Sequence, residues 1–107
     1  MILDKVKIDR HLNDLARRNA VKITYADKCF YFKLIDYCMA YGQQEGGNYT
    51  IELSIAAVSK ALKTPFSTTA QSLSRLEQCG VIVRVATKKS YASQTILPHE
   101  SIFLKEE

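Results

Sequence analysis

The stretch Ser67-Thr-Thr-Ala-Gln-Ser-Leu-Ser-Arg-Leu-Glu-Gln-Cys-Gly-Val-Ile-Val-Arg-Val85 decides the fold. Its pattern predicts a helix that begins at Ser67, which caps it, and ends at Gly80. Leu73 and Leu76 fall on one face of this helix and anchor it to a core. Glycine then permits the left-handed turn that starts a β-branched strand. Serine and threonine are mediocre helix formers, so a helix rich in them is usually kept for what its outer face contacts.

A hairpin follows this helix, and a second helix precedes it. Residues 81–86 and 93–97 predict strands, joined by a tip over 87–92. Pro65 ends the connection between the two helices, because proline cannot continue the preceding helix. Ser54 caps the earlier helix. Its predicted inner face consists of Ala57, Val58, Ala61 and Leu62.

A central core helix is predicted between Asp27 and Gly42, with Asp27 or a neighbour as its cap. Residues 43–48, which include two glycines, predict a turn, and residues 49–52 predict a short strand. The predicted elements together define an α+β fold. The apolar residues that recur at helical spacing in the core helix are Phe30, Tyr31, Leu34, Ile35, Cys38 and Tyr41.

The N-terminus predicts one further helix over residues 4–18, with Ile8, Leu12 and Leu15 as its apolar stripe. This stripe either packs against the chain's own domain or forms the interface of a homodimer. Residues 21–25 predict a short strand or an extended linker. We divide the chain into an N-terminal helix with its linker over 1–26, a domain over 27–98 and a C-terminal tail over 99–107.

The order of these elements resembles bacterial winged helix-turn-helix DNA-binding domains over about residues 27–98. The resemblance implies a three-helix core, a short strand and a β-hairpin wing, with the N-terminal helix as an addition. It rests on the runs Leu53-Ser-Ile-Ala-Ala-Val-Ser-Lys-Ala-Leu62, Thr64-Pro-Phe-Ser-Thr-Thr69 and Leu73-Ser-Arg-Leu-Glu-Gln-Cys-Gly-Val-Ile82. A fourth run, Phe32-Lys-Leu-Ile-Asp-Tyr-Cys-Met-Ala-Tyr-Gly42, resembles the first helix of winged domains in plasmid and phage replication proteins.

The outer face of the helix after Pro65 is the predicted reader of DNA. Glutamine and arginine make bidentate contacts to adenine and guanine edges in the major groove, and hydroxyls contact phosphates or bases. Two other interpretations remain. The face could be merely solvated, or Arg75 could pair within the chain, with the neighbours of Glu77 or with the tail. The predicted DNA-binding residues are Ser67, Thr68, Gln71, Ser74 and Arg75 on the helix, Lys60 and Lys63 beside the turn, and Lys88, Lys89 and Tyr91 on the wing; Gln78 shares the helix face.

Charge favours the same partner. The chain of 107 residues has a net charge of +4. Between Ser54 and Tyr91, six lysines and arginines stand against Glu77 alone, which suits a polyanion. High specificity usually requires two half-sites and hence a dimer.

Composition excludes several other classes. No apolar run approaches the length of a membrane span, and the N-terminus is no secretory signal, so we expect a cytoplasmic protein without a membrane partner. Cys29, Cys38 and Cys79 form no metal-binding spacing, and we expect buried reduced thiols. His11 and His99 are isolated. We therefore expect no catalysis, no metal and no cofactor.

Three functions stay open. The first is a duplex DNA-binding protein, either a transcriptional regulator or a replication accessory of a mobile element with a replication protein as partner. The second is single-stranded nucleic-acid binding by the same surface. We expect Phe66 to fold into the core; an exposed Phe66 would, with Tyr91, offer stacking surfaces to bases. The third is a winged helix that contacts only proteins.

Overall fold

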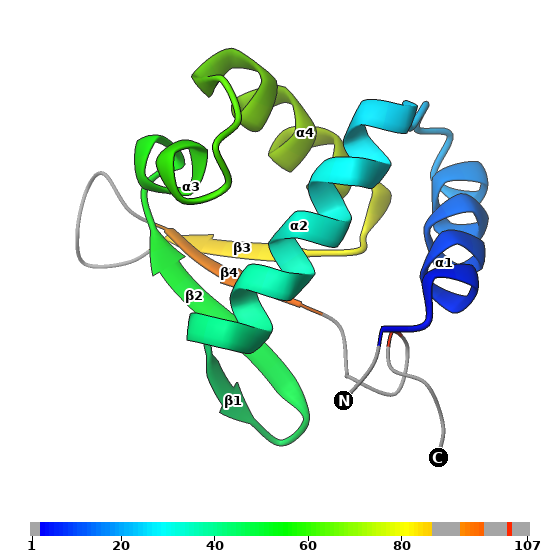
Figure 1. Cartoon of the computed structure of the whole chain (residues 1–107). Coiled ribbons are helices and arrows are strands. Elements are labelled where there is room, and N and C mark those ends of the chain that lie inside the picture. Colours follow the sequence, from blue (N-terminus) through cyan, green and yellow to red (C-terminus); the bar gives the residue numbers. More distant parts are fainter. Residues whose placement is uncertain (1–2, 87–92, 98–102, 104–107) are drawn as a thin grey trace.

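The computed structural model describes residues 3–86, 93–97 and 103, which form four helices and a four-stranded antiparallel sheet (Figure 1). The predicted α+β class is confirmed. None of the helices in these ranges is both long and apolar enough to cross a membrane.

Helix α1 spans Lys5–Arg18 and packs its apolar stripe against the rest of the chain. Asp4 caps it by accepting a hydrogen bond from the backbone N–H of Lys7 at 3.1 Å. Ile8 and Leu12 are no more than 1% exposed. Of the two roles open for the stripe, the structure therefore shows packing within the chain, and these two side chains are not available to a second copy.

Helix α2, Tyr25–Tyr41, is the core helix. A capping box starts it: Thr24 accepts a hydrogen bond from the N–H of Asp27, whose carboxylate accepts one from the N–H of Thr24. Residues 21–24 are an extended linker, not a strand. Five of the six apolar residues of α2 that were predicted to face the core are buried. The sixth, Tyr41, is 75% exposed because it is the last residue of the helix.

The segment predicted as a turn is a β-hairpin. Strand β1, Gln43–Glu45, pairs with strand β2, Asn48–Leu53, across Gly46 and Gly47. Both glycines have positive φ angles, 58° and 85°, which two-residue hairpin turns require. The prediction missed β1 because its residues are all polar and exposed.

Helices α3, Ile55–Ala61, and α4, Phe66–Cys79, follow the hairpin. Ser54 caps α3 as predicted, but Ala61 of the predicted inner face is exposed. The predicted cap at Ser67 is wrong: the residue before α4 is Pro65, which makes no side-chain capping bond. At the other end, Gly80 has φ 90° and ends α4 in the left-handed conformation, as predicted.

Strands β3, Val83–Ala86, and β4, Ser93–Ile96, complete a sheet of order β1-β2-β4-β3. Strand β4 lies between β2 and β3 and runs antiparallel to both. The three parts into which the sequence was divided share one core, to which Leu12, Leu76 and Phe103 contribute.

The end of α1 is tied directly to the end of α4. Asn19 Nδ2 donates to the Cys79 carbonyl at 2.9 Å, and Cys79 Sγ lies 3.7 Å from the Leu12 carbonyl. The three cysteines are free thiols; Cys38 and Cys79 are buried, whereas Cys29 is half-buried. Burial raises the pKa of the Cys38 thiol to about 12.

Candidate nucleic-acid interface

The outer face of α4 carries a continuous stripe of polar side chains. Ser67, Gln71, Ser74 and Gln78 are all exposed and recur every three or four residues. They span roughly 16 Å at a helical rise of about 1.5 Å per residue. Gln78 Nε2 lies 3.5 Å from Ser74 Oγ. We call these four residues the α4 stripe; Thr68, at its edge, is half-buried.

The inner face of α4 holds the stripe in place. Leu73 and Leu76 are at most 1% exposed, as predicted. Thr69, Ser72 and Cys79 are buried beside them. The stripe is therefore the outward side of a firmly anchored helix.

A buried carboxylate connects α4 to α2. Asp27 is 1% exposed. Ser72 Oγ donates to its Oδ1 at 2.7 Å, and Arg75 Nη1 lies 3.2 Å from each of its oxygens. Burial alone would raise the pKa of Asp27, but hydrogen bonds from Thr24 and Ser72 and the charge of Arg75 outweigh it, so this pKa lies below its ordinary value.

This contact changes the place of Arg75 in the site. The sequence predicts Arg75 on the outward face, with pairing inside the chain as the alternative. In the structure its guanidinium is bound to Asp27 and its side chain is 38% exposed. Arg75 therefore lies beside the α4 stripe, and its Nη1 points into the protein.

Two lysines lie close in sequence to the turn before α4: Lys60 in the last turn of α3 and Lys63 in the turn itself. Lys60 and Lys63 are exposed, and Lys63 has a positive φ of 53°. The turn is held by Thr64, whose N–H donates to the Ser59 carbonyl at 3.0 Å and whose carbonyl accepts hydrogen bonds from Ser59 Oγ and Thr69 Oγ1. Lys63 thus lies just before the start of α4, and Lys60 lies in the last turn of α3. The wing residues Lys88, Lys89 and Tyr91 lie outside the described residues.

Phe66 does not fold into the core, contrary to expectation. Its side chain is 56% exposed. Pro65 and Ser67 on either side are exposed as well, so the first turn of α4 extends past the core. An aromatic surface therefore lies beside the polar stripe and the turn lysines.

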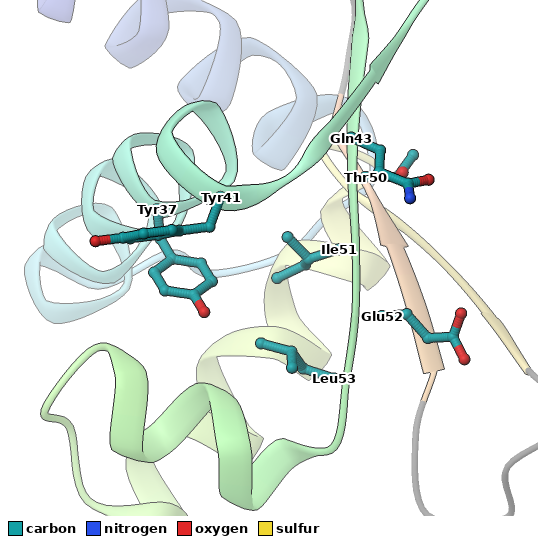
Figure 2. A pocket seen from close by; sticks show the side chains of 7 residues that line it. All are labelled: Tyr37, Tyr41, Gln43, Thr50, Ile51, Glu52 and Leu53. Carbon is teal, nitrogen blue, oxygen red and sulfur yellow. The ribbon is translucent and has the colours of Figure 1, made fainter.

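Two tyrosines form a further surface that the sequence analysis did not single out. Figure 2 shows Tyr37 and Tyr41 on α2 close to one another, with Ile51 and Leu53 of β2 on their side of the strand. The ring centroids are 4.9 Å apart at an angle of 44°. The pair lines two hollows, one of about 240 Å³ against β2 and one of about 330 Å³ against the end of α3. The i, i+4 spacing of the two tyrosines in the sequence would have indicated that they share one face of the helix.

Within the described part of the chain, no group of three histidine, cysteine, aspartate or glutamate side chains is placed to hold a metal ion. Comparison of the chain with protein-family models, with curated proteins and with solved structures gave no significant match.

Proposed function

We propose that this protein binds duplex DNA as a winged helix-turn-helix, with α4 in the major groove. The order of elements supports this: α2, β2, α3, α4, β3 and β4 follow one another, and β2 pairs with β4, which pairs with β3. Helices α3 and α4 are the helix-turn-helix, and β3 and β4 lead into the wing. The hairpin β1–β2 and helix α1 are additions to this arrangement.

The α4 stripe is the observation that carries the proposal. An α-helix fits the major groove, and its exposed side chains then face the base edges. Gln71 and Gln78 can each form a bidentate contact with adenine. The hydroxyls of Ser67 and Ser74 can form hydrogen bonds with bases or phosphates. The stripe carries no charge, so it would supply sequence preference more than affinity.

Affinity would come from the lysines around the stripe. Lys60 ends α3 and Lys63 precedes α4, while Lys88 and Lys89 belong in the sequence to the segment that joins β3 to β4. Four phosphate contacts give a slope of about −4 in log affinity against log salt. Such a monomer binds weakly, as a transcriptional regulator or a replication accessory of a mobile element would do before a partner adds contacts.

The exposure of Phe66 favours a second candidate, single-stranded nucleic acid bound by the same surface. Stacking of one base on an aromatic side chain is worth about 1–3 kcal/mol. Duplex binding remains the preferred proposal because the stripe extends over three turns of α4, whereas Phe66 is a single aromatic at its start.

Fluorescence anisotropy with a labelled blunt duplex and the matching single strand, across a salt series, tests both candidates. We expect the duplex to bind more tightly, with a salt slope of several units. Preference for the single strand would replace the first candidate with the second. If neither DNA binds at low salt, both nucleic-acid candidates are contradicted, and the remaining candidate is a surface that contacts proteins.

A further inference from the structure

Tyr41 is an aromatic side chain that the core does not bury. It is 75% exposed at the end of α2, although its neighbour Tyr37 packs against it. Tyr41 lines both hollows, so its exposed ring surface is open to a ligand in either of them. Figure 2 shows the ring in the hollow against β2. A flat partner would bury this apolar area, which the folded chain leaves in water.

The larger hollow adds a charge pattern to this ring. Lys33 on α2 and Lys63 in the turn before α4 line it, and Asp36 is its one acidic lining residue in the described chain. The remaining wall is apolar, from Ala40, Ala61 and Leu62. The lining thus combines two tyrosine rings, three aliphatic side chains, two cations and one carboxylate.

This combination fits a nucleotide better than a plain apolar side chain. A nucleotide has a flat base that stacks on aromatic rings and a phosphate that attracts lysine. Lys63 also belongs to the surface that the proposed function assigns to DNA. A strand that contacts Lys63 would therefore arrive at the rim of the hollow.

We propose that the hollow between α2 and the α3–α4 turn receives an unpaired base of a single-stranded DNA extension, stacked on Tyr41, with its phosphates on Lys33 and Lys63. The proposal rests on duplex binding by α4, because the duplex brings the extension to Lys63. On this proposal, the DNA that the protein binds best is a junction between duplex and single strand.

The test compares a blunt duplex with the same duplex carrying a short single-stranded extension, of either polarity. One stacked base corresponds to a gain of about 5-fold to 150-fold in affinity. We expect one polarity of the extension to give such a gain with the unchanged protein. The variant Tyr41→Leu should lose the gain and keep its affinity for the blunt duplex.

Tyr25→Leu is the matched control. Tyr25 is 82% exposed and lies at the opposite end of the same helix, outside the hollow. Its variant should keep the full gain. Equal losses in both variants, or a Tyr41→Leu variant that keeps the gain, would overturn the proposal.

A tryptophan at the site supplies a direct signal. The chain contains no tryptophan, so Tyr41→Trp introduces a single reporter and retains an aromatic ring. The extension should quench its fluorescence, and the affinity gain should persist. If a short acidic peptide with a central phenylalanine changes the tryptophan fluorescence and DNA does not, the hollow binds protein segments and not bases. That result would contradict the proposal.

The outcomes separate the two claims. A protein that binds the blunt duplex but gains nothing from either extension leaves the proposed function intact and refutes the base site. A protein that binds single-stranded DNA as tightly as DNA with a duplex part refutes duplex reading by α4 and, with it, the proposed preference for the junction. Absence of binding to every DNA refutes both.

Discussion

Arg75 Nη1 lies 3.2 Å from each carboxylate oxygen of Asp27, a residue 48 positions earlier in the chain. This contact joins α2 to α4, the helix that carries the α4 stripe. It also pairs Arg75, the one lysine or arginine on α4, with a carboxylate inside the protein.

Replacing Asp27 by asparagine should destabilise the fold by about 1–3 kcal/mol, because charged hydrogen bonds inside the protein are lost. Urea denaturation measures the change. Asp36→Asn is the control on the same helix, since Asp36 is exposed, and it should alter stability by no more than about 0.5 kcal/mol. Equal effects of the two variants would contradict a special role for Asp27.

The pH dependence of stability follows from the lowered pKa of Asp27. A carboxylate whose pKa is lower in the folded state than its ordinary value, 3.8, stabilises the fold above that value. This contribution is lost as the pH falls through the folded-state pKa. The difference in unfolding free energy between the unchanged protein and Asp27→Asn should therefore be constant near neutral pH and shrink below about pH 4. A difference that grows in acid would contradict this sign.

Gln71→Ala and Lys63→Gln should affect DNA binding in different ways. Loss of a bidentate glutamine contact costs about 1–3 kcal/mol on the preferred sequence and relaxes selection at that base. Loss of Lys63 weakens all sequences alike and reduces the salt slope by about 1. Selection from a random duplex library and a salt titration distinguish them. Gln43→Ala, an exposed glutamine in β1, should change neither.

Phe66→Ala separates the two nucleic-acid candidates. Because Phe66 is 56% exposed, the variant should keep most of its stability. Duplex affinity should then change little, whereas a single-strand binder would lose about 1–3 kcal/mol per stacked base. Anisotropy on both DNA forms, after a denaturation check, gives the answer. A large loss on the duplex alone would contradict this assignment.

Gly80→Ala should cost about 1–2 kcal/mol from backbone strain at φ 90°. An added Cβ would meet Asn19 Nδ2 at 3.8 Å, an ordinary contact, so crowding adds nothing. Gly80→Asn should cost less, because asparagine tolerates the left-handed region. Thermal or urea unfolding of the two variants checks the order, and an alanine variant as stable as the asparagine one would contradict it.

The sequence predicted the elements whose signals are local. The spacing of Leu73 and Leu76 followed by Gly80 defines α4 because burial and the left-handed turn both act within a few residues. Strand β1 carries no such signal, since Gln43–Glu45 is polar throughout and is a strand only through pairing with β2.

Contacts between distant segments could not be read in this way. Spacing shows which residues share a helix face, but not which residue on another helix they meet, so the partner of Arg75 was missed. Tyr41 and Phe66 were expected in the core because they are apolar, yet both stand at helix ends that extend past it. Both of these exposed aromatic side chains thus lie at helix ends.

The β1–β2 hairpin has a consequence for solubility. A strand at the edge of a sheet exposes backbone donors and acceptors that other chains can pair with, which promotes aggregation. Strand β1 pairs with residues 48–50 of β2, and β4 pairs with residues 50–53 on the other side, so β1 shields the first half of β2 from further pairing. Strand β1 itself is three residues long and has only polar, exposed side chains, so it is a poor template for further association.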